Sequence, residues 1–297
     1  MRAIAVILMI GVLFCFGCER SEELPESDTE VTDFMLSESW PDEPERIVSL
    51  APNITELLFE LGLGDRVVAV TRYCDWPPEA EDVPTIGGML DPDYEAILGA
   101  RPDVVVGVID GADHQTVDKF DGAGVAYGFL QIDDLNTVSE GIDRLGAWFS
   151  IEKEAAALNK RFQNELKALE DRIGESTKLE AKKALLVFDR QPVVAAGPGS
   201  FGEDLLNLAG LENAVRGDIG AYPVLDMEKV LAANPAVIVD VTMGDGEDEV
   251  LDYWRRFESL EAVERGAVVH IDDPVMMRPG TRIPDAVDRL GRALEEL

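Results

Sequence analysis

One pattern of residues occurs twice in this chain, and the two copies lie 133 residues apart. The first copy, Asp93–Val106, reads Asp-x-Glu-x-Ile-Leu-x-Ala-x-Pro-x-Val-Val-Val. The second, Asp226–Val239, repeats it with Val-Leu and Val-Ile-Val at the aliphatic positions. Each copy predicts a short helix capped by an aspartate, a turn at the proline, and a strand covered on both faces as in a parallel sheet. The chain is therefore predicted to contain two α/β units of similar plan.

A second pair of segments supports an internal duplication. Glu56–Leu63 and Asp204–Leu211 both place an acid before two leucines, with a Gly-Leu pair further on. Each segment precedes its copy of the first pattern, and two matches in the same order are better explained by duplication than by chance. We predict an N-terminal lobe over residues 46–149 and a C-terminal lobe over residues 175–297, both with mainly parallel sheets.

The stretch between the lobes has the pattern of one long helix over residues 150–174. Apolar side chains recur at spacings of three and four, and no proline or glycine interrupts the stretch before Gly174. At 1.5 Å per residue such a helix is about 35 Å long, which is comparable with the diameter of a small domain. We predict a rigid helix that crosses from one lobe to the other. The alternative is a surface helix that belongs to one lobe.

Charge and composition exclude several classes of protein. Asp and Glu number 59 against 26 Lys and Arg, so the net charge is −33, whereas a nucleic-acid-binding protein needs a basic face. Two His residues do not suffice for a His-rich metal site, and three Cys residues cannot build a disulfide scaffold. Of the thiols, Cys74 alone lies in the predicted lobes, where we expect it to be buried and inert.

The first residues resemble an export signal. Residues 1–17 combine a positive start with an apolar run, and a small residue precedes Cys18. This arrangement resembles the lipobox of a bacterial lipoprotein, in which Cys18 would be lipidated. An ordinary signal peptide and an uncleaved anchor are the alternatives. Residues 18–45 are acidic, with little apolar periodicity, and are predicted to form a flexible tether.

The lobes resemble the helical-backbone (class III) substrate-binding proteins of ABC importers for cobalamin and ferric siderophores. The resemblance covers the chain from about Arg46 to the C-terminus. It rests on five segments: Arg46–Glu56, Tyr73–Pro78, Gly87-Gly88, Glu95–Asp103 and Arg278–Arg282. The Tyr-x-Asp-aromatic-Pro-Pro run at Tyr73 is most similar to the vitamin B12-binding branch. The resemblance implies two lobes with a ligand cleft between them, and a transport protein rather than an enzyme.

By this resemblance, the ligand is cobalamin or a related cobamide, and residues of both lobes contact it. The aromatic rings would cover a large corrin ring, and the glycines would allow close approach of the backbone. No cofactor and no metal site are expected. The predicted ligand-binding residues are Pro52, Asn53, Tyr73, Asp75, Trp76, Gly88, Met89, Phe201, Tyr222, Arg278 and Arg282.

The resemblance also assigns one acidic residue of each lobe to docking on the membrane permease. Glu95 and Glu228 occupy these positions, which are equivalent in the repeated pattern. An acid in the first turn of a helix is favourable there in any case, because of the helix dipole. The implied partners are an ABC permease with its ATPase and a small-molecule ligand. The implied protein is a monomer at the periplasm or cell surface, held to a bacterial membrane only by its lipid.

Two alternatives to a cobalamin-binding protein remain. A ferric siderophore or haem would use Arg278 and Arg282 against anionic groups, and Tyr73 as an iron ligand. A dinucleotide-dependent enzyme would use Gly197–Gly202, which matches Gly-x-Gly-x-x-Gly. The imidazoles of His114 and His270 lie far apart in sequence, and we expect a structural role for His270.

Overall fold

The computed structural model describes residues 34–109, 114–175 and 182–297. These residues fall within one compact unit, Asp33–Leu297. The predicted signal peptide, 1–17, and the predicted lipidation site, Cys18, lie outside the described residues. In the described part of the chain, no helix has the length and apolarity needed to cross a membrane.

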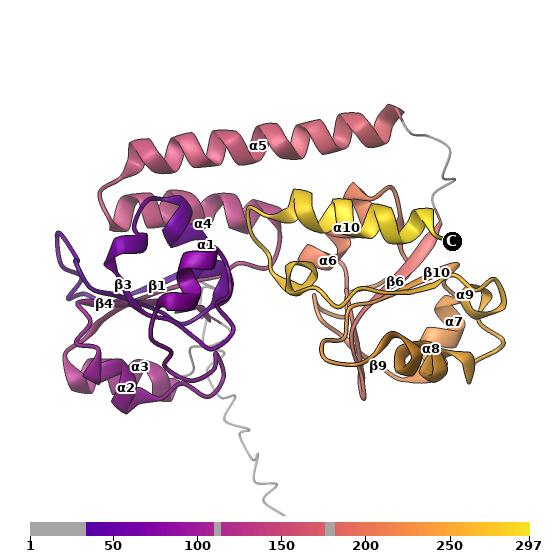
Figure 1. Cartoon of the computed structure of the whole chain (residues 1–297), viewed down its shortest axis with the longest axis horizontal. Helices are drawn as coiled ribbons and strands as arrows, with labels where there is room; N and C mark the ends of the chain where they lie inside the picture. Colours follow the sequence, from indigo (N-terminus) through magenta and orange to yellow (C-terminus); the bar gives the residue numbers. More distant parts are fainter. Residues whose placement is uncertain (1–33, 110–113, 176–181) are drawn as a thin grey trace, which may run out of the picture. The chain divides into compact units, whose positions relative to one another are not determined.

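The N-terminal lobe is built on a five-stranded sheet with the order β1-β5-β4-β2-β3. Strands β2 to β5 are parallel, whereas β1 runs antiparallel to β5 at the edge. Helices α1 and α4 lie on the side of the sheet that faces α5, and α2 and α3 lie on the other side (Figure 1). The elements are β1 (Phe34–Leu36), β2 (Ile47–Ser49), α1 (Pro52–Glu60), β3 (Val67–Ala69), α2 (Tyr94–Gly99), β4 (Val104–Val108), α3 (His114–Ala123), β5 (Ala126–Leu130) and α4 (Leu135–Trp148), with short 3-10 turns at Gly64–Arg66 and Pro78–Asp82.

The C-terminal lobe repeats this plan around the order β11-β10-β6-β7-β9, with β8 also paired to β6. Strands β11, β10, β6 and β8 are parallel, and β7 and β9 are antiparallel to their neighbours. The prediction of two α/β lobes is confirmed, with sheets parallel at the centre and mixed at the edges. The elements are β6 (Lys183–Arg190), β7 (Val193–Ala195), α6 (Phe201–Leu208), β8 (Glu212–Asn213), β9 (Val224–Leu225), α7 (Met227–Ala233), β10 (Val237–Asp240), α8 (Glu247–Arg255), α9 (Glu261–Glu264), β11 (Val268–His270) and α10 (Ile283–Glu295), with a 3-10 turn at Pro274–Met277.

The repeated pattern folds in the same way in both lobes. Asp93 caps α2 and Asp226 caps α7, each by accepting a hydrogen bond from the backbone N–H three residues on. Each helix is followed by a residue in the left-handed region, Arg101 at φ 49° and Asn234 at φ 43°. The strand of each copy, β4 or β10, then lies inside its sheet between two parallel neighbours.

The long helix α5 (Glu152–Glu175) contacts elements of both lobes. It packs along α4 of the N-terminal lobe and also contacts α6 and α10 of the C-terminal lobe. Arg172 forms an ion pair with Asp288 of α10 at 2.9 Å. The helix therefore crosses from one lobe to the other, as predicted, and does not belong to one lobe alone (Figure 1).

The two lobes share one apolar core on the side of α5 and have separate cores on the other side. The shared cluster contains buried residues of the N-terminal sheet, α1, α4, α5, the C-terminal sheet, α6 and α10. A second cluster contains only residues of the C-terminal lobe, and a third contains only residues of the N-terminal lobe. Burial of apolar surface under α5 therefore ties the lobes together along one side.

The predicted tether extends too far into the chain. Residues 34–36 form strand β1, paired with β5. Trp40 packs against Trp148 and Phe149, with ring centres 5.4 and 5.5 Å apart, and its indole N–H donates to the Trp148 carbonyl at 2.7 Å. The acidic composition of this segment predicted a tether, but a few of its apolar side chains pack against residues about 100 positions later. The folded body therefore begins by residue 34 and not at residue 46.

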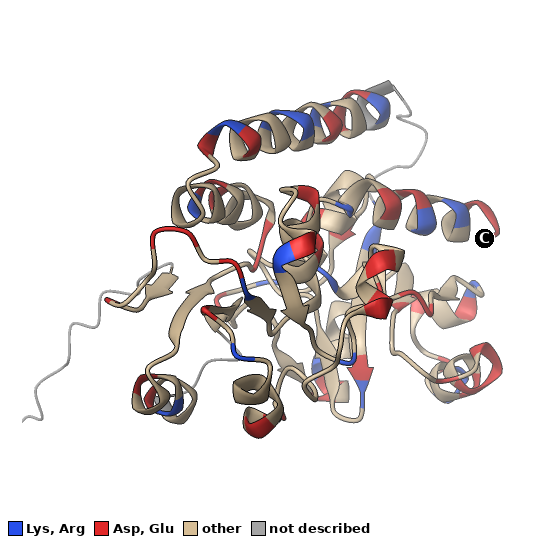
Figure 2. Ribbon diagram, turned by 60° about the vertical axis from the view of Figure 1, so that its left-hand side comes forward, with Lys and Arg blue, Asp and Glu red and all other residues tan. Residues whose placement is uncertain are grey.

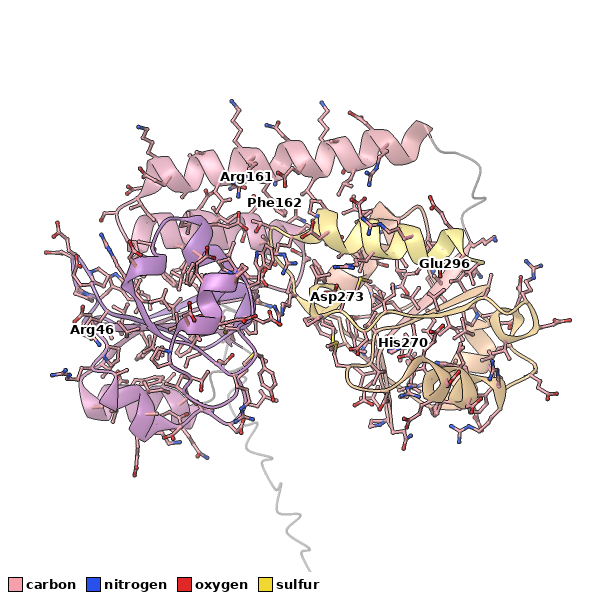
Figure 3. The ribbon with its side chains drawn as sticks, viewed as in Figure 1. Arg46, Arg161, Phe162, His270, Asp273 and Glu296 are labelled. Atoms are coloured by element: carbon pink, nitrogen blue, oxygen red, sulfur yellow. The ribbon has the colours of Figure 1, made fainter. Side chains whose placement is uncertain are left out.

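Removing the Phe162 side chain tests how much α5 contributes to the shared core. Phe162 is 1% exposed and lies on the side of α5 that faces the lobes (Figure 3). We expect Phe162→Ala to lower the free energy of unfolding by about 3–5 kcal/mol, because it removes a buried ring and leaves a cavity. Urea denaturation measures this, and Lys160→Ala, at an exposed position of the same helix, should change stability by less than about 0.5 kcal/mol. Equal effects of the two variants would contradict the packing described.

Candidate functional site

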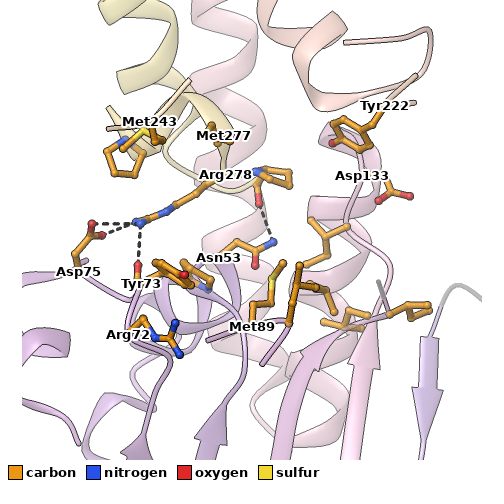
Figure 4. A pocket seen from close by; sticks show the side chains of 18 of the residues that line it. Asn53, Arg72, Tyr73, Asp75, Met89, Asp133, Tyr222, Met243, Met277 and Arg278 are labelled. Carbon is orange, nitrogen blue, oxygen red and sulfur yellow. Dashed lines mark hydrogen bonds and ion pairs between the residues drawn. The ribbon is translucent and has the colours of Figure 1, made fainter. Parts of the chain in front are cut away.

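A cleft of about 970 Å³ lies between the two lobes. Its lining comes from strand ends, from the start of α1 and from loops next to the strands of both sheets, and most of the lining side chains are apolar (Figure 4). This volume is at the upper end of the range of about 300–1,000 Å³ that is common for small-molecule sites. The lining residues are Pro52, Asn53, Arg72, Tyr73, Asp75, Met89, Leu90, Asp91, Val108, Ile109, Leu130, Gln131, Ile132, Asp133, Tyr222, Met243, Gly244, Pro274, Met277, Arg278 and Pro279.

The structure brings seven of the eleven predicted ligand-binding residues together in this cleft. Two of them are aromatic rings with substantial exposed surface, Tyr73 at 51% and Tyr222 at 40%. The Tyr222 ring packs edge-on against Phe188, with ring centres 5.5 Å apart, so its position is supported from behind. The seven are Pro52, Asn53, Tyr73, Asp75, Met89, Tyr222 and Arg278.

Four predicted residues lie outside the lining. Phe201 is 1% exposed and belongs to the shared core, because the Ser200 cap starts α6 with Phe201 directed inward. The prediction for Phe201 is therefore wrong. The Arg282 guanidinium stacks on the Trp76 ring at 4.1 Å, and neither residue lines the cleft. Gly88 directly precedes a lining residue but does not line the cleft itself.

Arg278 reaches from the C-terminal lobe to carboxylates of the N-terminal lobe. Its guanidinium lies 3.1 Å from a Glu56 carboxylate oxygen and also pairs with Asp75. It further donates to the Tyr73 carbonyl at 2.8 Å (Figure 4). Its positive charge is therefore balanced within the protein. The sequence patterns did not indicate this role for Glu56, because nothing in the sequence connects it with a residue 222 positions later.

Glu56 is a buried acid at the contact between the lobes. Burial raises the pKa of its carboxyl, and the nearby charges of Arg278 and Arg282 oppose this increase. Asp204, at the matching position of the second repeat, also has a pKa raised by burial. Its carboxylate accepts a hydrogen bond from the Leu135 N–H of the N-terminal lobe at 3.0 Å. In each lobe, therefore, one partly or fully buried acid contacts the other lobe.

The described lining holds two cations and three carboxylates. Arg72 pairs with Asp91 at 2.7 Å, and Arg278 pairs with Asp75. The third carboxylate, Asp133, accepts a hydrogen bond from the Gln131 amide at 2.6 Å. Acidic residues are also spread over the helices and loops of both lobes (Figure 2). The described cleft therefore offers no lining cation that lacks a carboxylate partner.

The glycine-rich segment Gly197–Gly202 does not have the setting of a dinucleotide site. It follows β7, which is antiparallel to β6, whereas the dinucleotide motif requires a parallel strand. The Glu203 carboxylate accepts the Gly199 N–H at 2.8 Å and so already occupies the anion position of this turn. A Cβ at Gly197 would lie 2.1 Å from the Gly220 carbonyl oxygen. The segment is a tightly packed turn into α6.

Cys74 and His270 are held by contacts within the fold, and the side chain of His114 is not described. Cys74 is buried between the hydroxyls of Thr55 and Thr71, both at 3.1 Å, and burial raises the pKa of its thiol. The Nε2 atom of His270 lies 3.0 Å from the Thr242 carbonyl. The His114 side chain is outside the described residues. Within the described ranges, no group of three His, Cys, Asp or Glu side chains could hold a metal ion.

Glu95 and Glu228 are exposed second residues of α2 and α7. Both helices lie on the sides of their sheets that face away from α5 (Figure 1). Neither acid forms an ion pair within the described part of the chain.

The model of the family described as "Periplasmic binding protein" matches residues 47–275. The chain belongs to this family. Its members are substrate-binding transport proteins and not enzymes, they act outside the cytoplasm, and they work with an ABC permease and its ATPase. The match covers α5 and most of both lobes, and it ends before α10.

Curated relatives and solved structures agree with this family. The vitamin B12-binding protein of Yersinia pseudotuberculosis is 26% identical over 210 residues, which are 71% of this chain and 74% of that protein. A periplasmic heme-binding protein of Pseudomonas aeruginosa has a TM-score of 0.75 at 23% identity, over 84% of this chain and 92% of that one. The periplasmic vitamin B12-binding protein of Vibrio cholerae has a TM-score of 0.71 at 24% identity, over 86% and 98% of the two chains. These structures have the class III two-lobed fold seen in this periplasmic binding protein.

Removing Arg278 tests the buried charge contact between the lobes. We expect Arg278→Met to lower the free energy of unfolding by about 3 kcal/mol, because Glu56 loses its nearest partner in a buried setting. Adding Glu56→Gln should recover part of this loss, since the buried Glu56 would otherwise keep only the more distant Arg282, at 3.5 Å, as its ion-pair partner. Urea denaturation measures both, with Arg72→Met as the control: it breaks an exposed pair, which is worth less than about 1 kcal/mol. Equal losses for Arg278→Met and Arg72→Met would contradict the account.

Proposed function

We propose that this periplasmic binding protein captures cobalamin or a related cobamide in its cleft and delivers it to an ABC permease. We further propose that the protein is a monomer, held at the membrane by a lipid on Cys18. Residues 1–17 would then be its signal peptide, and the residues before Phe34 would form the acidic tether.

The charge balance of the cleft is the observation that carries the choice of ligand. Both arginines of the described lining are already paired with carboxylates, and the lining holds a further carboxylate, Asp133. Such a surface suits a large ligand of low net charge better than a polyanion, because an anion would have to displace an acid from its arginine. A cobamide fits this description, since its corrin ring is apolar on its faces and edged by neutral amides.

The apolar part of the lining supports the same choice. Tyr73 and Tyr222 supply exposed rings with polar ends, one from each lobe. Met89, Met243 and Met277 add flexible apolar contacts from three separate loops (Figure 4). Together these side chains would cover a broad flat ligand from both lobes. The relatives whose names contain vitamin B12 agree with this proposal.

A haem or ferric siderophore is the second candidate. The exposed phenol of Tyr73 favours it, because a tyrosine oxygen is an established ligand of ferric iron. Solved neighbours that bind heme have the same fold. Against this candidate, Arg278 pairs with Asp75 and Glu56, and Arg282, the second arginine expected to meet its anionic groups, lies outside the lining.

Absorption titrations with cyanocobalamin, hemin and a ferric catecholate siderophore test the proposed ligand. We expect a corrin spectrum to be retained through gel filtration, and no retention of the other two. Tyr222→Ala should weaken cobalamin binding by about tenfold or more, because the ring covers the ligand from the C-terminal lobe. Trp76→Ala is the matched control, since this ring is 41% exposed but outside the lining. Retention of heme or siderophore alone would contradict the proposed ligand.

We also propose that Glu95 and Glu228 dock the protein on its permease. Two exposed acids, one on each lobe, form a two-point contact that fixes orientation and speeds encounter with a basic surface. The double variant Glu95→Ala/Glu228→Ala is expected to abolish uptake of labelled cobalamin into cells and to leave its affinity in solution unchanged. Glu140→Ala/Glu261→Ala removes the same charge at other positions of the two lobes and serves as the control. Loss of cobalamin affinity in the first variant would argue against a docking role.

A further inference from the structure

Most identities shared by α2 and α7 are explained by folding. Asp93 and Asp226 cap their helices, and Ile97 and Val230 are fully buried. The two prolines that follow, Pro102 and Pro235, come directly after residues in the left-handed region and turn the chain into β4 and β10. Each of these residues has a structural reason to be kept in both copies.

Two shared positions of the repeat are exposed and are not fixed by burial or capping. The helix dipole favours an acid at the first of them but leaves the leucine at the second unexplained. Glu95 and Glu228 are exposed and form no ion pair in the described residues. Leu98 and Leu231 are 44% and 39% exposed, and neither belongs to any of the three apolar clusters. In each copy the leucine is three residues after the glutamate, so the two side chains share one face of the helix.

The positions on either side of each glutamate have diverged. Tyr94 of α2 corresponds to Met227 of α7, and Ala96 corresponds to Lys229. The leucines are therefore not the remains of a copy in which every residue was kept. A single exposed leucine needs no explanation, but the same exposed leucine beside the same exposed glutamate on two diverged lobes does.

We infer that Leu98 and Leu231 are contact residues for the permease, each completing a two-residue docking patch with the glutamate of its own lobe. This inference rests on the proposed docking role of the glutamates. The fitting partner surface has two equivalent places, each with a basic side chain beside an apolar recess. A duplicated pair of patches suits a permease made of two equivalent subunits, because each lobe can then meet the same surface.

The two residue types would act on different rate constants. The glutamates act at a distance, so they raise the association rate in a manner that salt suppresses. The leucines act only in contact, where their burial from water slows dissociation. The inference therefore makes a kinetic prediction that differs from that for the glutamates.

Binding to the cognate permease–ATPase complex in nanodiscs, followed by surface plasmon resonance at two salt concentrations, tests this. We expect Leu98→Ala/Leu231→Ala to dissociate about tenfold faster or more, with nearly unchanged association. Leu98→Met/Leu231→Met should restore slow dissociation. Leu36→Ala is the control, because Leu36 is 38% exposed and lies on β1, away from α2. Cobalamin affinity should be the same in all of these variants.

The outcomes separate this inference from the docking proposal. If Glu95→Ala/Glu228→Ala weakens binding but the leucine variant binds like the parent protein, the leucine inference is overturned and the docking proposal stands. If the glutamate variant also binds like the parent protein, the docking proposal itself fails. An equal loss in Leu36→Ala would overturn the inference. So would a dimer of this chain, seen by sedimentation, that the leucine variant dissociates.

Discussion

Burial of apolar surface beneath α5 is the constraint on which the rest of the structure depends. The shared cluster joins the two sheets through α4, α5, α6 and α10, so separating the lobes on this side would expose core side chains to water. On the other side each lobe has a core of its own, and among the described residues no apolar cluster joins the two lobes there. The cleft follows from this asymmetry. Because the two lobes are joined along one side, a cleft remains between them on the other side, and the shared core fixes its shape.

Buried charges secure the same arrangement from within. Arg278 connects the C-terminal lobe to Glu56 and Asp75, and Asp204 connects it to the start of α4. Taking an acid such as Glu56 out of water is costly, as the raised pKa of its carboxyl indicates, and the cost is offset only while its arginines remain in place. These contacts therefore favour one relative position of the lobes. They also remove positive charge from the cleft, which links the architecture to the proposed choice of a ligand with low net charge.

The sequence predicted those features that depend on local order, and missed those that depend on distant pairing. The repeated Asp-x-Glu pattern predicted α2, α7 and the strands after them, because capping and burial are set within about a dozen residues. The apolar stripe that predicted α5 is set by local sequence order in the same way. Strand β1 was missed because it is stabilised by β5, almost a hundred residues later. The cleft was predicted in part: its loops were identified, but the inward turn of Phe201 and the pairing of Arg278 depend on the tertiary structure.

A fused pair of lobes should move little when a ligand enters, and this is the central physical claim. Small-angle X-ray scattering of the protein with and without saturating cyanocobalamin tests it most directly. The account predicts superimposable profiles, together with a corrin spectrum that remains with the protein. A clear decrease in the radius of gyration on binding would contradict it, because the lobes would then be closing around a hinge that the shared core does not allow.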